Sequence, residues 1–128
     1  MIAFTSRVNG AAEETDIVIR WADTGLEVVC TSESAGKRRF TPAVFKALQR
    51  RLVDIAAAPS LDVMRALPGK CHQLTGDRTS QFAVHLDGQY RLVFEPDHQP
   101  IPIDTSGGID WREVNKVVIL EVVNYHGH

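Results

Sequence analysis

The clearest periodic pattern in the chain predicts an amphipathic helix from Thr41 to Ala58. Thr41 is a favoured N-cap residue, and Pro42 suits the first helical position, where no intrahelical N–H bond is lost. Pro59 then ends the pattern. Between these limits the apolar residues recur on one side at helical spacing, at Val44, Phe45, Leu48, Leu52, Ile55 and Ala56. We therefore expect one face of this helix to be buried.

Four other segments have the pattern of β-strands. Asp16–Trp21 is a short run rich in β-branched and aromatic residues, and Gln81–Leu86 and Gln89–Glu95 form two further strands joined at an Asp-Gly pair. Lys116–Val123 is almost continuously apolar, which is typical of a strand covered on both faces. A helix among several strands predicts an α+β fold.

The register of the hairpin decides which way Arg91 points. A two-residue turn would mix apolar and polar side chains on both faces, whereas a three-residue loop, Leu86–Gly88 with Gly88 left-handed, changes the parity. One face then holds Phe82, Val84, Tyr90, Leu92 and Phe94, and the other holds Gln81, Ala83, His85, Gln89, Arg91 and Val93. Because a slip by one residue exchanges the faces, the cleaner division is preferred. It places Arg91 on an open, mostly polar face.

The remaining segments are assigned from capping and loop residues. Asp23-Thr24 can cap a short helix, and Ser32–Arg39, which contains a glycine, is expected to be a loop. Residues 96–110 hold three prolines and a Gly-Gly pair, so we expect an excursion from the sheet. Residues 1–15 lack periodicity and predict a flexible N-terminal arm before a single domain over residues 16–128.

Composition narrows the cellular setting. A chain of 128 residues with 44% hydrophobic and 23% charged residues is typical of one globular domain. There is neither a signal-peptide pattern nor an apolar run of the roughly 20 residues that would span a bilayer, so we expect a cytoplasmic protein without a membrane partner. Cys30 and Cys71 are expected to be reduced, partly buried thiols, because two distant cysteines do not make a disulfide framework.

Charge is distributed unevenly along the chain. The formal net charge is −2, yet the segment from Lys37 to Arg91 carries ten Lys and Arg residues against four Asp residues. A basic middle within an acidic frame can bind phosphate locally. For Lys37–Arg51 alone, a solvated basic helix face is an equally good interpretation.

Three motifs occur in a specific order. Leu67–Arg78 reads LPG-x-x-H-x-L-x-GDR, Gln81–Phe94 forms the hairpin, and Val117–His126 ends in Asn-Tyr-His. From about Ile17 to His126 the chain resembles the HigB branch of the RelE/ParE toxin superfamily, with Asn124 where that family carries an acid.

This resemblance implies a RelE/ParE-like fold, in which a twisted antiparallel sheet has the N-terminal helices packed on one face and a concave basic cleft on the other. It also implies a toxin of a type II toxin–antitoxin system that cuts mRNA in the ribosomal A site without metal or other cofactor. The expected partner is a helix-turn-helix antitoxin, HigA-like, that holds the toxin inactive.

Metal-free RNA cleavage needs a base for the 2′-hydroxyl, cations for the phosphate and an acid for the leaving 5′-oxygen. The resemblance assigns proton transfer to His72 and His126, phosphate binding to Arg91 with Lys70 and Arg78, and base stacking or backbone orientation to Tyr125. The alternatives are a surface role for His72, pairing of Arg91 with Glu95 or Asp77, and fraying of the last residues. We expect His85 and His98 to be bystanders.

Asn124, expected in the catalytic set, and Thr75, expected in the RNA-binding set, both depart from the family pattern, and these departures weaken the assigned chemistry. Asn124 cannot act as a base or hold an imidazolium by charge, and Thr75 replaces a lysine that would face phosphate. Activity could therefore be attenuated. Two alternatives stay open: a ParE-like toxin that inhibits gyrase, and a non-catalytic binding module that keeps the fold.

Overall fold

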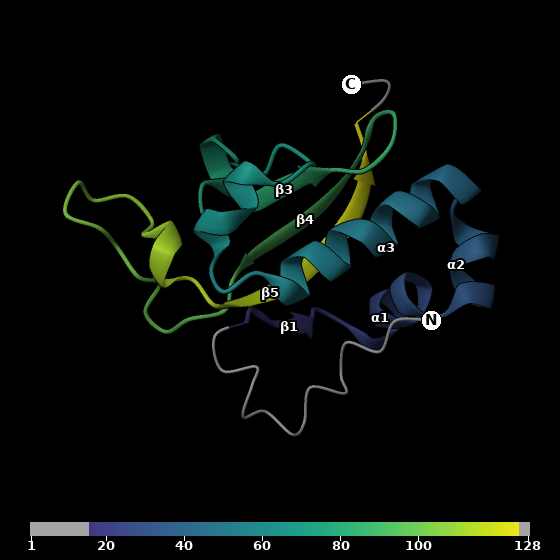
Figure 1. The fold of residues 1–128 in the computed structure, drawn as a ribbon, viewed down its shortest axis with the longest axis horizontal. Helices are drawn as coiled ribbons and strands as arrows, with labels where there is room; N and C mark the ends of the chain where they lie inside the picture. The colour runs from purple at the N-terminus through teal and green to yellow at the C-terminus, as the bar shows by residue number, and fades with distance from the viewer. Residues whose placement is uncertain (1–15, 126–128) are drawn as a thin grey trace.

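The computed structural model describes residues 16–125, which build a five-stranded sheet of order β1-β5-β4-β3-β2 with helices on one face (Figure 1). The expected N-terminal arm and His126 lie outside this range. The elements in chain order are β1 (Val18–Trp21), α1 (Thr24–Thr31), α2 (Glu33–Arg39), α3 (Pro42–Ala57), η3 (Leu61–Ala66), β2 (His72–Gln73), η4 (Gly76–Arg78), β3 (Phe82–His85), β4 (Tyr90–Pro96), η5 (Trp111–Glu113) and β5 (Lys116–Asn124).

The sheet is mixed, although the expected architecture was antiparallel. Strands β2 to β5 pair antiparallel, as expected, whereas β1 pairs with β5 in parallel. A parallel pair needs a long crossover connection. In this chain the whole segment from α1 to η5 forms that connection. Strand β1 can therefore pair in parallel with the free edge of β5. The α+β class is confirmed.

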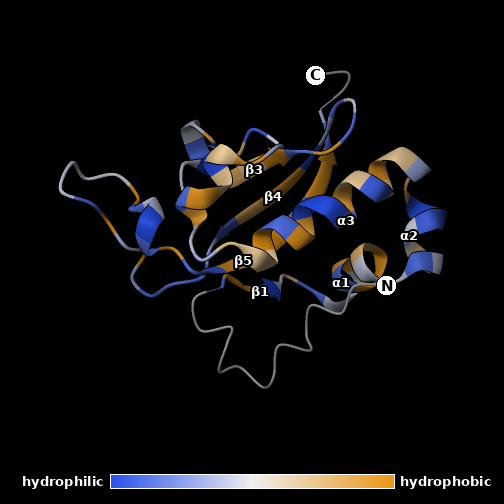
Figure 2. Ribbon diagram, in the orientation of Figure 1, coloured by the Kyte–Doolittle hydropathy of each residue, from blue (hydrophilic) through white to orange (hydrophobic). Residues whose placement is uncertain are grey.

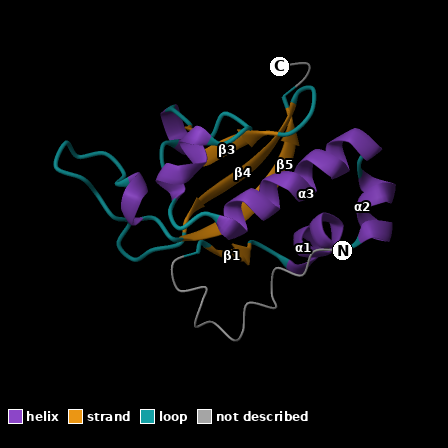
Figure 3. Cartoon of the chain, in the orientation of Figure 1, coloured by secondary structure: helices purple, strands orange, loops and turns teal. Residues whose placement is uncertain are grey.

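The predicted central helix is confirmed as α3. The Thr41 hydroxyl accepts a hydrogen bond from the backbone N–H of Val44 at 3.2 Å, as an N-cap does. All six residues of the predicted apolar stripe are buried. Figure 2 shows the apolar side of α3 turned toward the sheet. Figure 3 shows α1 and α2 beside one end of α3. The core combines this stripe with the fully buried Phe82, Val84, Leu92 and Phe94.

The expected loop at Ser32–Arg39 is wrong, because the structure has helix α2 there. The Ser32 hydroxyl caps it by accepting from the Ala35 N–H at 3.3 Å. Gly36 is buried in this helix, and a Cβ atom there would lie 2.1 Å from the Phe45 ring. Its glycine therefore permits close packing against α3 rather than marking a turn. The capped helix predicted after Asp23 is confirmed as α1, with the Asp23 carboxylate accepting from the Leu26 N–H at 2.7 Å.

The hairpin has the predicted faces but a different loop. Val84 pairs with Leu92 and His85 with Arg91, so the parity is that of a three-residue loop. The loop residues are 87–89 rather than 86–88, because the Leu86 N–H donates to the Tyr90 carbonyl at 3.0 Å. Leu86 is only 5% exposed, and its burial favours this extra pair. The centre of the loop, Gly88, has φ +59°, the left-handed conformation predicted for it.

The last strand is covered on both faces only in its first half. Val117, Val118 and Ile119 are buried, whereas the residues from Leu120 to Val123 are half-buried. The excursion at 96–110 is confirmed, and a bridge between Ile103 and Ile109 closes it on itself. Among the helices of residues 16–125, none is long and apolar enough to cross a membrane.

Both cysteines are free and buried, as the sequence predicted. Burial raises the pKa of each thiol to about 12, and the nearby Arg39 and Arg65 offset only part of this effect on Cys30 and Cys71 respectively. A thiol that stays protonated is a poor nucleophile. Neither cysteine is therefore a candidate for covalent catalysis.

Candidate active site

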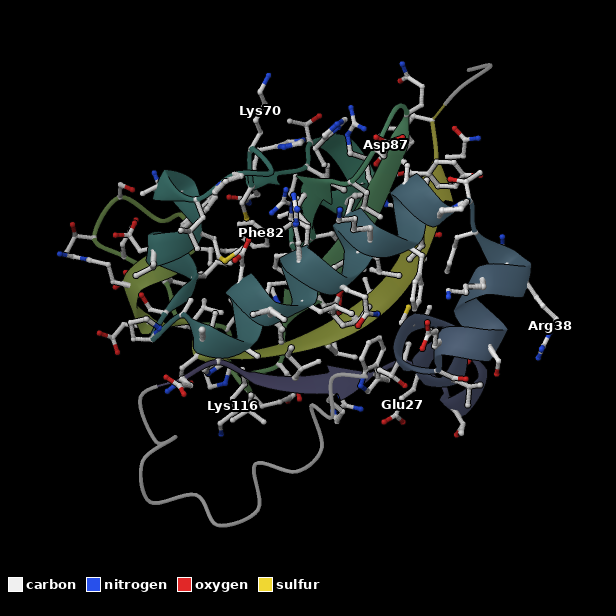
Figure 4. The ribbon with its side chains drawn as sticks, turned by 45° about the vertical axis from the view of Figure 1, so that its right-hand side comes forward. Glu27, Arg38, Lys70, Phe82, Asp87 and Lys116 are labelled. Carbon is white, nitrogen blue, oxygen red and sulfur yellow. The ribbon has the colours of Figure 1, made fainter. Side chains whose placement is uncertain are left out.

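A cleft of about 310 Å³ opens on the sheet face opposite α3 and is lined by Gly69, Lys70, His72, His85 and Arg91. A loop and three strands supply these residues: the loop before β2, the paired strands β2 and β3, and the start of β4. In Figure 4, Lys70 projects away from the body of the protein at the rim of this region. The structure thus brings together three of the predicted site residues, Lys70, His72 and Arg91.

Arg91 lies on the predicted face, and its guanidinium is tethered to the hairpin. Its Nη1 donates to the carbonyls of Tyr90 at 3.0 Å and Gly88 at 3.3 Å. The guanidinium carbon is 5.7 Å from the centre of the Tyr125 ring, within the range of a cation–π contact. No salt bridge between Arg91 and an acid is found among residues 16–125, so the alternative pairing with Glu95 or Asp77 is absent there.

A strained turn sets the opposite wall of the cleft. Gly69 has φ +112° and Lys70 has φ +52°, a conformation that costs a non-glycine residue roughly 1–2 kcal/mol. The Gly69 carbonyl accepts from the His85 N–H at 2.6 Å, and the Lys70 carbonyl lies 2.8 Å from His72 Nδ1. The turn therefore holds one histidine by its backbone and the other by its ring, while placing the Lys70 ammonium at the rim.

Arg51 supports this turn from the helical side of the sheet. Its Nε donates to the His85 carbonyl at 3.3 Å, and its Nη1 forms an ion pair with Asp54 at 2.9 Å. Only 13% of the Arg51 side chain is exposed. A residue of α3 is thus hydrogen-bonded to the strand that carries His85, and this bond fixes the end of β3 relative to the helix.

His85 is part of the cleft, although the sequence predicted a bystander. It pairs directly with Arg91 across the β3–β4 ladder. Burial is the main cause that lowers the pKa of His85, and the positive charge of Arg91 adds to it. The predicted register already placed both residues on one face, which was the signal available in the sequence. His98, the other expected bystander, accepts a hydrogen bond from the Asn115 N–H at 3.2 Å and lies outside the cleft.

Arg78 and Thr75 do not line the cleft. Arg78 forms an ion pair with Glu121 of β5, and its Nε donates to the Gln81 side chain at 2.7 Å. Glu121 pairs with Val93, which has no exposed surface even though it belongs to the open face. The guanidinium is therefore paired with an acid of the sheet, although both side chains stay partly exposed. Thr75 is exposed and precedes η4.

The end of the chain places its two described site residues differently. Asn124 pairs with Tyr90 and therefore shares its face, which is the helical side of the sheet and not that of Arg91. Tyr125 lies beside Arg91, and its N–H donates to the Gln89 carbonyl at 3.0 Å. His126 follows beyond the described residues, so its predicted role stays a prediction.

Comparison with known proteins supports the fold and leaves the family open. No family model matches the chain, and no curated protein is similar to it in sequence. Among solved structures, a YoeB/ParE toxin from Agrobacterium tumefaciens is similar, with a TM-score of 0.51 and 9% sequence identity over 84% of this chain and 98% of that one. The RelE/ParE-like fold is thereby confirmed, whereas the resemblance to the HigB branch stays a prediction.

Proposed function

We propose that this protein is the toxin of a type II toxin–antitoxin system and cuts mRNA in the ribosomal A site. The observation that supports this most directly is a single cleft holding Arg91, Lys70 and His72 on the open face of a sheet whose fold is that of a known toxin. Cations that bind the phosphate and an imidazole that transfers a proton are among the groups that metal-independent cleavage of RNA requires.

In this proposal the scissile phosphate binds between Arg91 and Lys70. The planar guanidinium donates to the phosphoryl oxygens, where negative charge increases in the transition state. Tyr125, in contact with Arg91, stacks on a neighbouring base. The 2′-hydroxyl attacks the adjacent phosphorus, the bond to the 5′-oxygen breaks, and proton transfer involves His72 together with His126.

The contacts of Arg78 reduce the cationic surface available to RNA. Because Arg78 is paired with Glu121, we assign phosphate binding chiefly to Lys70 and Arg91 rather than to a broad basic face. The RNA contacts predicted for Arg78 and Thr75 stay predictions. Because Asn124 lies on the other face of the sheet, the proposed chemistry does not depend on it. The pairing of Arg78 and the position of Asn124 both agree with an attenuated rate.

The proposed partner is a helix-turn-helix antitoxin, HigA-like, encoded in the adjacent gene. A cytoplasmic ribonuclease directed at the cell's own mRNA has to be held inactive by a bound protein. We expect the two proteins to co-purify as a stable complex. A toxin that arrests growth when it is produced alone, and is harmless together with that partner, would support the assignment.

Induced expression followed by mapping of mRNA 5′ ends tests the activity. We expect new in-frame ends that disappear in Arg91→Ala and His72→Ala, with a loss of cleavage of roughly two to three orders of magnitude for Arg91→Ala. Arg112→Ala is the matched control, because it removes an exposed arginine, 77% accessible, outside the cleft. If both site variants cleave as well as the parent, the site is wrong.

A second candidate is a ParE-like toxin that inhibits gyrase. The similar solved structure is a YoeB/ParE toxin, and the pairing of Arg78 with Glu121 leaves less positive surface for RNA than the sequence suggested. DNA-damage signalling without mRNA cuts would select this candidate. A folded protein that produces neither response would instead be a binding module with the same fold.

A further inference from the structure

Two histidines face the same cleft from adjacent strands. His72 of β2 is directly opposite Ala83 of β3, and His85 lies two residues further along β3 on the same face. Such diagonal neighbours in an antiparallel pair are separated by roughly 7–8 Å. This spacing joins backbone positions, and side chains of the length of histidine can both reach a phosphodiester bound in the cleft between them. Arg91 is directly opposite His85, so the predicted phosphate-binding cation lies at the same end of the cleft.

The turn at Gly69-Lys70 orients both histidines for this arrangement. A carbonyl oxygen can only accept, so the 2.8 Å contact between His72 Nδ1 and the Lys70 carbonyl requires a hydrogen on Nδ1. The nitrogen left for exchange with a substrate is therefore Nε2. The His85 backbone is fixed from two sides, by its N–H to the Gly69 carbonyl and by its carbonyl to Arg51.

We propose that His85 and His72 form the acid–base pair that cleaves RNA at the phosphate bound by Arg91, with His85 as the base and His72 as the acid. This inference rests on the proposed ribonuclease function and replaces His126 as the second histidine. An unprotonated ring nitrogen of His85 accepts the proton of the 2′-hydroxyl, and the 2′-oxygen bonds to the phosphorus. As the bond from phosphorus to the 5′-oxygen breaks, His72 in its imidazolium form donates the Nε2 proton to that oxygen and keeps the hydrogen on Nδ1, which gives a 2′,3′-cyclic phosphate and a 5′-hydroxyl.

The charges around His85 suit the role of a base. Arg91 of β4, Lys70 of the turn and Arg51 of α3 all disfavour a second positive charge, and they act with burial to keep its pKa below the ordinary range. The carboxylate of Asp87 in the hairpin loop raises the pKa of His85, but its effect is smaller than that of burial or of Arg91. His72 is a further titratable group that lines the cleft with His85. A neutral imidazole near pH 7 can accept a proton without first losing one.

Single-turnover cleavage of a defined mRNA on purified ribosomes tests the pair. We expect His85→Gln to lower the rate by about two orders of magnitude. It should also abolish the fall in rate toward acidic pH that the parent shows as His85 becomes protonated. His98→Gln is the matched control, since His98 also has a lowered pKa and lies outside the cleft. Added imidazole should restore part of the rate to His85→Ala and none to Arg91→Ala.

The possible outcomes distinguish a failure of the histidine pair from a failure of the proposed ribonuclease function. A parent that cleaves, with His85→Gln equally fast or with an unchanged acidic limb, overturns the pair and leaves the ribonuclease function standing. A folded parent that cleaves no RNA on ribosomes overturns both. A parent whose products carry 3′-phosphate and 5′-hydroxyl ends without a cyclic intermediate also overturns the pair. Circular dichroism spectra that match the parent establish that each variant is folded.

Discussion

Replacing Gly69 with alanine tests the turn that forms the wall of the cleft. Gly69 has φ +112°, which lies beyond the left-handed region that L-residues occasionally adopt. A Cβ atom there would lie 3.0 Å from Cδ and 3.1 Å from Nε of Arg51. Arg51 has little freedom to move, because it is bonded to both Asp54 and the His85 carbonyl. The change therefore strains the backbone and displaces a fixed side chain.

The expected cost is the sum of these two effects. The unfavourable φ costs about 1–2 kcal/mol for a residue with a Cβ. Displacing Arg51 by a few tenths of an ångström, at some expense to its hydrogen bonds, costs about 1 kcal/mol more. We expect Gly69→Ala to lower the free energy of unfolding by about 2–3 kcal/mol, which corresponds to a fall in Tm of roughly 8–12 °C for a domain of this size.

Urea denaturation of the purified protein measures this cost against two other glycines. Gly76 has φ +68°, and a Cβ atom there would meet no other atom within 4 Å, so Gly76→Ala isolates the backbone effect at about 1 kcal/mol. A Cβ at Gly108 would make only contacts of 3.9 Å or longer, and Gly108→Ala should change stability least. Equal stability of Gly69→Ala and Gly76→Ala would refute the role of Arg51. If Gly69→Ala and Gly108→Ala have the same free energy of unfolding, neither the backbone strain nor the contact with Arg51 matters at Gly69.

Two further predictions concern ionisable groups that lie outside the cleft. Because burial raises the thiol pKa of Cys30 and Cys71 to about 12, the native protein should resist iodoacetamide at pH 8, and both thiols should react in urea; rapid labelling of the native protein would contradict their burial. His98 has a lowered pKa, mainly through burial, so the folded state binds fewer protons than the unfolded state, whose pKa is about 6.5. The contribution of His98 to the free energy of unfolding should therefore be fully present above that pH and be lost as the pH falls below it. His98→Gln should make the free energy of unfolding depend less on pH between pH 7 and 5. An unchanged slope would exclude His98 as the cause.

Capping residues and the spacing of apolar residues were sufficient to predict the elements whose formation depends on neighbours in the sequence. The cap at Thr41 and the helical spacing that follows located α3 to within one residue at each end. Alternation along the hairpin gave the correct face for Arg91, because the core accepts only one parity of β3 and β4. The exact loop was not predictable, since it depends on the burial of Leu86 by residues distant in the sequence.

The errors come from contacts between distant segments. Gly36 suggested a turn, and nothing nearby in the sequence indicates that the Phe45 ring occupies the space of its missing side chain. Arg78 suggested a phosphate contact, and its partner Glu121 lies 43 positions away. In each case the residue type was interpreted by its commonest local role, whereas a tertiary partner decides its role in the fold.

The position of the cleft follows from how the open face of the sheet is divided. Arg78 and Glu121 neutralise each other over the middle of that face, beside the buried Val93. Positive charge that forms no salt bridge within residues 16–125 then remains at one end, where Lys70 and Arg91 line the cleft. In an acidic protein such a site attracts a phosphate only at short range, because charges further than about 8 Å apart are screened at physiological salt. Binding should therefore depend on delivery of the RNA by a larger partner, and the ribosome required by the proposed function is a partner of that kind.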